Sequence, residues 1–148
     1  MLNPNYETRG EIKDQAQALA YLLGGKAIFT VKNEETGNRY TFKVEQPKPE
    51  MPHFVRVLTG PDNGGHWTYL GAIFNAYRFR LTRASKMSKG STPVRAFGWI
   101  FHKLQKGELP SEIHFWHEGR CGRCGRRLTV PESIKAGFGP ICITKIGR

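Results

Sequence analysis

Two stretches of the chain carry apolar residues at helical spacing, which predicts two amphipathic helices. The first extends from Glu11 to Leu23 and is closed by Gly24 and Gly25. Its expected apolar face consists of Ile12, Ala16, Leu19 and Leu23. The second extends from Thr92, an N-cap followed by Pro93, to about Lys106. Its expected buried stripe consists of Val94, Phe97, Ile100, Phe101 and Leu104, and a second face carries Arg95, Trp99, His102 and Lys106.

The other periodic segments alternate or are rich in β-branched and aromatic residues, so they are expected to be strands. These segments are residues 27–32, 39–45, 53–59, 66–74, 77–83 and 111–116. Turn-forming residues separate the first pair and the second pair, which predicts hairpins, and residues 46–52 contain three prolines and predict a connecting loop.

In the strand expected at 77–83, the residues assigned to the core side are Tyr77, Phe79 and Leu81, opposite Arg78, Arg80 and Thr82. Residues 84–91 are small, polar and basic and predict a loop. The fold class is therefore α+β: an antiparallel sheet with one or two packed helices.

All three cysteines lie within the last 28 residues of the sequence, and their grouping indicates a metal-binding site. Cys121 and Cys124 form a Cys-x-x-Cys pair with a glycine after each cysteine, the spacing of a knuckle that points two sulfurs at one Zn²⁺. Cys142 would add a third thiolate. We expect His117 to complete a closed Cys3His site; His114, on the opposite strand face, a carboxylate or water are the alternatives. The context does not fit a redox dithiol, and the odd cysteine count does not fit a disulfide framework.

Between the knuckle and Cys142, Thr129 and Glu132 form a capping-box pattern, with Pro131 and Gly137 as start and stop of a short helix. A further helix beginning near Pro140 would place Cys142 in its first turn. Knuckle, loop and a cysteine borne on a helix are typical of a treble-clef or ribbon-like zinc subdomain. The expected organisation is a lead-in and helix at 1–25, an α+β core at 26–116 and a zinc-binding tail at 117–148.

The run from His117 to Cys142 contains the knuckle and ends with the third cysteine. It reads His-x-Gly-Arg-Cys-Gly-Arg-Cys-Gly-Arg-x-Leu-Thr-x-Pro-Glu-Ser-Ile-x-x-Gly-x-Gly-Pro-x-Cys. It resembles the C-terminal signature of an uncharacterised family of small phage, prophage and bacterial proteins. The resemblance covers roughly the last fifth of the chain. It implies a zinc-binding tail and a phage or mobile-element setting, and it implies no activity.

The charge of the chain adds a candidate partner. The 148 residues include 23 Lys and Arg against 12 Asp and Glu, a formal net charge of +11. Residues 63–107 contain no acidic residue at all, so ion pairs within this window cannot neutralise its cations. Those cations are Arg78, Arg80, Arg83, Lys86, Lys89, Arg95, Lys103 and Lys106. The tail adds Arg120, Arg123, Arg126 and Arg127, more than the single net negative charge of a Zn²⁺ with three thiolates requires.

Aromatic residues are interleaved with these cations, a mixture that suits single-stranded nucleic acid. They are Trp67, Tyr69, Tyr77, Phe79 and Trp99. A core position is the more ordinary interpretation for most of them. Trp99 is the exception, because Arg95 and His102 are its neighbours on the helix face.

The leading hypothesis is therefore a small basic zinc-containing protein of phage type that binds single-stranded DNA or RNA without catalysis. The alternative is a phage accessory protein that inhibits an acidic host enzyme or defence complex through the same face. No paired carboxylates, P-loop or nucleophile motif favours an enzyme. Without a membrane-length apolar run or a signal-peptide core, the chain is expected in the cytoplasm of a bacterial host.

Overall fold

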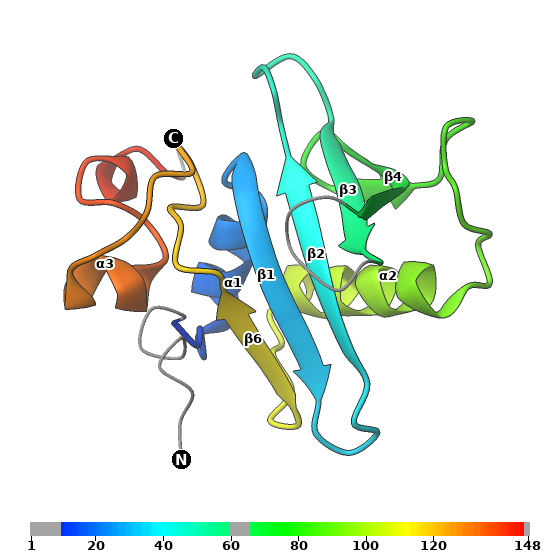
Figure 1. The fold of residues 1–148 in the computed structure, drawn as a ribbon, viewed down its shortest axis with the longest axis horizontal. Coiled ribbons are helices and arrows are strands. Elements are labelled where there is room, and N and C mark those ends of the chain that lie inside the picture. Colours follow the sequence, from blue (N-terminus) through cyan, green and yellow to red (C-terminus); the bar gives the residue numbers. More distant parts are fainter. Residues whose placement is uncertain (1–9, 60–65, 147–148) are drawn as a thin grey trace.

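The computed structural model describes residues 10–59 and 66–146, which form an α+β fold around a six-stranded antiparallel sheet (Figure 1). The strands are β1 (Lys26–Asn33), β2 (Arg39–Glu45), β3 (His53–Leu58), β4 (Trp67–Phe74), β5 (Arg78–Arg80) and β6 (Ile113–His117). The helices are α1 (Gln15–Leu22), α2 (Thr92–Gln105), α3 (Pro131–Ala136) and a 3-10 turn, η2 (Cys142–Thr144). The predicted α+β class with an antiparallel sheet is confirmed, and each predicted strand range holds a strand.

The strand order β5-β4-β3-β2-β1-β6 follows from the connections. Short turn-rich links join β1 to β5 as a meander, in which each strand pairs with its predecessor. The chain then crosses the sheet as α2 and returns as β6 on the free edge of β1, with Phe29 opposite His117 and Val31 opposite Phe115. The residues that follow β6 therefore begin at the edge opposite β5.

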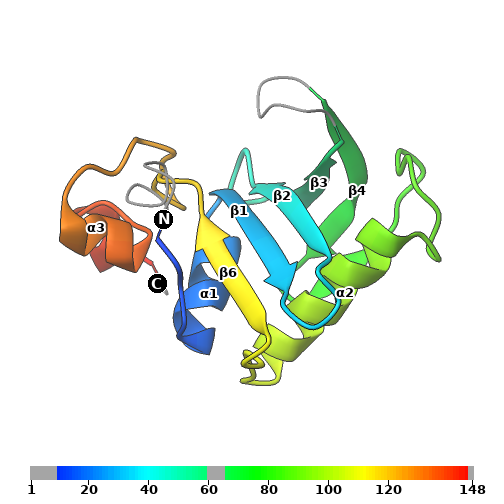
Figure 2. The same ribbon diagram turned by 60° about the horizontal axis from the view of Figure 1, so that its bottom comes forward.

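Both longer helices pack against the same face of the sheet (Figure 2). Tyr21 of α1 contacts Phe29 and Phe115, and Phe97 of α2 contacts Phe42 and Phe79. The sheet residues in these pairs all extend from the inner face of the sheet, where strand alternation places mainly apolar side chains. The five predicted core residues of α2 are all buried, and the second face of that helix is exposed.

The first helix begins about one turn later than predicted, at Gln15 instead of Glu11. Asp14, not a residue near Glu11, is the N-cap, because its carboxylate accepts a hydrogen bond from the Gln17 amide at 2.9 Å. Ile12 is buried but precedes the helix, where its amide donates to Phe115 O. The buried helix face consists of Ala18, Tyr21 and Leu22, whereas Ala16 is exposed.

Two local assignments are also corrected. Residues 75–77 form the turn into β5, with Asn75 and Ala76 at positive φ, so Tyr77 is 70% exposed instead of facing the core. Phe79 does face the core, 4.8 Å from Phe97 between ring centroids. The N-cap position of α2 is Ser91, one residue before the predicted Thr92.

No helix in the described part of the chain is long and apolar enough to cross a membrane.

His53 makes folding stability depend on pH. Burial lowers the pKa of His53, whose Nε2 lies 2.9 Å from Leu23 O, so the folded protein keeps this ring neutral where the unfolded chain takes up a proton near pH 6.5. The unfolded state then binds more protons, and the free energy of unfolding should fall as the pH is lowered from 7 to 5, by at most about 1.4 kcal/mol per pH unit from this residue. Urea titrations should show a shallower fall for His53→Leu. Both proteins are measured with chelator present. If the free energy of unfolding falls equally steeply with pH in the wild type and in His53→Leu, the assignment to His53 is contradicted.

Candidate metal centre

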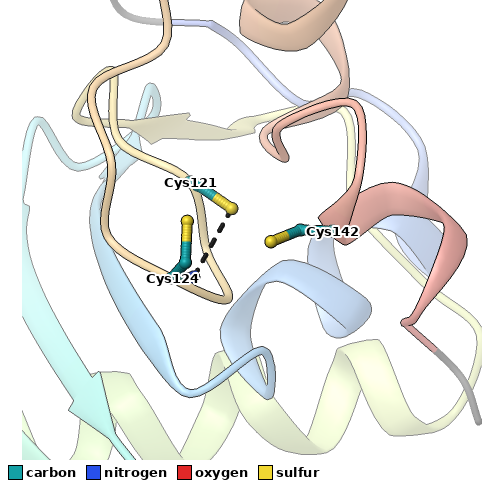
Figure 3. A group of neighbouring side chains, drawn as sticks. All are labelled: Cys121, Cys124 and Cys142. Carbon is teal, nitrogen blue, oxygen red and sulfur yellow. Dashed lines mark hydrogen bonds between the residues drawn. The ribbon is translucent and has the colours of Figure 1, made fainter.

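Three cysteine thiols converge at the end of the sheet that carries β6 (Figure 3). Cys121 and Cys124 come from the loop after β6, and Cys142 begins η2. The three sulfur atoms lie within 4.8 Å of one another. Such a group of thiols could hold one metal ion, because thiolates at this separation can converge on a single centre.

A small hairpin of backbone hydrogen bonds positions the first two cysteines. The Cys121 amide donates to Arg126 O at 2.8 Å, and the Gly125 amide donates back to Cys121 O at 2.9 Å. Gly125 has φ +79°, in the left-handed region that favours glycine, so the sequence Cys-Gly-Arg-Cys-Gly closes the turn without strain. The amides of Arg123 and Cys124 then point at Cys121 Sγ, at 3.4 and 3.5 Å.

The electrostatics of the three thiols suit a cation. Burial opposes ionisation of Cys121, but the N–H groups of Cys124, Gly139 and Arg123 outweigh it and lower the pKa of that thiol. Burial raises the pKa of Cys142, with Arg123 opposing and the neighbouring thiols adding to the rise. The Arg123 guanidinium lies 3.6 Å from Cys142 Sγ. A bound cation would favour the thiolate form of all three cysteines.

His117 is not part of this cluster, which corrects the predicted ligand set. It is fully buried on the inner face of β6, and its Nε2 is hydrogen-bonded to Ile134 O. Its Nδ1 accepts from the Gly119 amide at 2.9 Å, and burial lowers its pKa. Both ring nitrogens are therefore engaged in holding α3 and the loop onto the sheet.

The alternative ligand His114 is also elsewhere. Its Nδ1 lies 2.8 Å from Glu11 Oε2 and its Nε2 lies 3.4 Å from Glu34 Oε1, on the outer face of the sheet. Hydrogen bonding to Glu11 raises the pKa of His114. Within residues 10–59 and 66–146, no histidine, carboxylate or fourth cysteine joins the three thiols. In place of the predicted closed Cys3His set, the structure brings together three thiols beside a cavity of about 430 Å³ that Leu128, Val130 and Ile141 help to line.

The elements that carry the tail largely follow the prediction. The short helix is present as α3, and Gly137 ends it at φ +81°. The capping box is not formed, because Val130 is the N-cap and no side chain caps the helix. Cys142 lies in a 3-10 turn of three residues instead of the first turn of an α-helix.

The structure divides the thirteen predicted nucleic-acid contacts into three groups. The groups are the β5 group (Arg78, Arg80, Arg83, Lys86 and Lys89), the α2 group (Arg95, Trp99, Lys103 and Lys106) and the tail group (Arg120, Arg123, Arg126 and Arg127). Most of these side chains are exposed, but β5 and β6 lie at opposite edges of the sheet, so the β5 and tail groups do not form one patch.

Ion pairing differs between the groups. Lys103 is paired with Glu108 at 3.1 Å and lies 5.8 Å from the centre of the Trp99 ring, so an acid just beyond the acid-free window neutralises one of its cations. In the tail, Arg123 faces Cys142 Sγ and Arg120 donates to Gly125 O at 3.3 Å. The β5 group has no acidic partner within 4 Å among the residues described.

Comparison with known proteins adds one finding. Residues 114–147 match a family of unknown function, DUF6011. The match contains the three cysteines and agrees with the resemblance to an uncharacterised family. No curated protein and no solved structure matches the chain.

The cysteine cluster predicts metal content. Purified protein should contain about one transition-metal ion per chain, and Cys124→Ala should lose it, because two thiolates cannot hold the ion as three do. Elemental analysis of the dialysed protein measures the ratio, with Ser85→Ala as a control far from the cluster. Full metal content in Cys124→Ala, or none in the wild type, would contradict the site.

A His117 variant should behave in the opposite way to Cys124→Ala with respect to metal content. His117→Ala should keep its metal content but lose stability by roughly 1–3 kcal/mol, because Ile134 O and the Gly119 amide would lose a buried partner. Elemental analysis and urea unfolding of the same preparation separate the two effects. Loss of metal at unchanged stability would restore His117 as a ligand.

Proposed function

We propose that this protein is a small zinc-containing protein that binds nucleic acid without catalysing a reaction. The observation that carries the proposal is the β5 group: five exposed cations without an acidic partner among the described residues. Cations that no carboxylate neutralises favour a polyanion, and phosphates at regular spacing suit cations arranged along a strand and the loop after it.

Zinc is the metal that the donor set favours. Three thiolates select a soft or borderline ion, and a Cys-x-x-Cys knuckle combined with a third cysteine after a short helix is typical of structural zinc subdomains of treble-clef or ribbon type. Bound zinc would supply structural charge: with three thiolates it leaves one net negative charge, which Arg123 faces. Its role would be to fix the tail against β6 and α1.

Single-stranded nucleic acid fits better than a specific duplex site. Neither α2 nor α3 presents a recognition helix: α2 is packed along the sheet, and α3 is only six residues long. The phage or mobile-element setting rests on the resemblance of the tail and is part of the proposal, as is a location in the bacterial cytoplasm.

Reversing the charge of the β5 group tests the proposal. Arg78→Glu, Arg80→Glu and Arg83→Glu together should abolish binding of a labelled oligonucleotide, and wild-type affinity should fall steeply with rising salt as condensed counterions compete. Fluorescence anisotropy measures both. The matched control changes Lys13, Arg39 and Lys48, which are also exposed, to Glu, so that the net charge shifts equally.

Equal loss in both triple variants would show that only net charge matters. Absence of wild-type binding even at low salt would overturn the proposal. A tight complex with an acidic host protein would then be the result to seek.

A further inference from the structure

The sheet has a second face, opposite α1 and α2, that no described element covers (Figures 1 and 2). Strand alternation places Phe54 and Arg56 of β3 on this outer face, beside Trp67 and Tyr69 of β4. Arg78 and Arg80 of β5 extend from the same face, because Phe79 between them points into the core. The part of the outer face from β2 to β5 is thus both aromatic and cationic.

Rings and cations on this part of the outer face are paired with residues of other strands. The Arg56 guanidinium lies 5.7 Å from the centre of the Tyr69 ring, and Lys43 Nζ lies 5.3 Å from the centre of the Trp67 ring. Phe54 is next to Tyr69, with ring centroids 6.3 Å apart. Glu45 is near both cations, 3.5 Å from Arg56 and 3.8 Å from Lys43, and keeps them over the strands.

A shallow groove lies beside Phe54, Arg56 and Tyr69. It has a volume of about 590 Å³ and is lined by residues that include Phe54, Arg56, Tyr69, Phe74, Thr82 and Lys86. Two contacts position its far wall: the Lys86 amide donates to Tyr69 O at 3.0 Å, and Thr82 Oγ1 donates to Tyr69 Oη at 3.2 Å. The groove therefore has aromatic walls and a cation at each side.

The charge balance identifies the occupant. The described cations on this part of the outer face include Lys43, Arg56, Arg78, Arg80 and Lys86, and Glu45 is the carboxylate paired with two of them. An apolar protein segment would leave these charges without partners. A strand of nucleic acid offers both flat bases for the rings and phosphates for the cations.

We propose that this groove, centred on Tyr69 and Arg56, is a base-stacking site for single-stranded nucleic acid. The inference rests on the proposed function and gives it a position: the bases lie on the outer face of β3 and β4, and the phosphates follow the β5 group. A duplex hides the faces of its bases in its own stack, so stacking here requires an unpaired strand. Tyr69 and Arg56 were absent from the predicted contact set.

Two oligomers of equal charge separate stacking from phosphate attraction. One is an oligothymidine of about 12 nucleotides, and the other is its abasic counterpart, which keeps the sugar-phosphate chain without bases. The wild type should bind the oligothymidine roughly 5- to 150-fold more tightly than the abasic oligomer, the range expected for one stacked base. Anisotropy at low salt measures both affinities.

Three variants locate the stacking. Tyr69→Leu removes the ring and should reduce the preference for oligothymidine, whereas Tyr69→Phe keeps the ring and should retain it. Tyr77→Leu is the matched control, because Tyr77 is exposed in the turn before β5 and does not line the groove. Melting curves of all three establish that they are folded.

The outcomes distinguish the inference from the proposed function. Equal wild-type affinity for the two oligomers would overturn the stacking site and leave phosphate binding intact. The stacking site would also be overturned if Tyr69→Leu retained the preference for oligothymidine over the abasic oligomer while Tyr77→Leu lost it. Failure of the wild type to bind either oligomer would remove the proposed function itself. The wild-type comparison needs no variant, so it decides even if Tyr69→Leu does not fold.

Discussion

The burial of Tyr21 is the interaction on which the arrangement of helix, sheet and cysteine-containing tail depends. Its ring lies between Phe29 and Phe115 of the sheet and Phe138 of the tail, at centroid distances of 6.4, 6.2 and 5.8 Å. Its hydroxyl lies 3.1 Å from Ile28 O and 3.2 Å from Arg120 O, and burial raises its pKa. A Cβ on Gly122 would approach the ring to 2.6 Å, so the glycine between the first two cysteines is also the residue that lets the knuckle approach α1.

The strands and α2 could be predicted because their signals are local, whereas the boundary of α1 required knowledge of the core. Apolar spacing selected Ala16 and Leu19, but the helix begins after the Asp14 cap, and it packs Ala18 and Tyr21 against the core. A tyrosine is as compatible with the surface as with the core in a sequence pattern. Its burial here depends on Phe115 and Phe138, which are distant in sequence.

The candidate site likewise has one part that the local sequence predicts and another part that depends on contacts between distant residues. The two cysteines of the knuckle and their glycines form a local motif, and the sequence was sufficient to group them with Cys142. Strand alternation puts His117 on the same face of β6 as Ile113 and Phe115. Because that face is the core, alternation argues against His117 as a ligand. Alternation also contained the signal for Arg56 and Tyr69, but the pairing of β3 with β4, with its irregularity between Val55 and Arg56, is needed to bring them together.

The cysteine cluster lies at one sheet edge and the β5 group at the other, which constrains any ligand that both could share. Six strands place these edges roughly 24 Å apart. The intervening outer face near β6 carries Glu11 and Glu34 against His114, and carboxylates there would repel a phosphate chain. A nucleic acid on the outer face is therefore expected to stay over β3, β4 and β5. Arg123, whose guanidinium lies at Cys142 Sγ, is then better explained by the charge that a metal-thiolate centre would carry than by the same strand of phosphates.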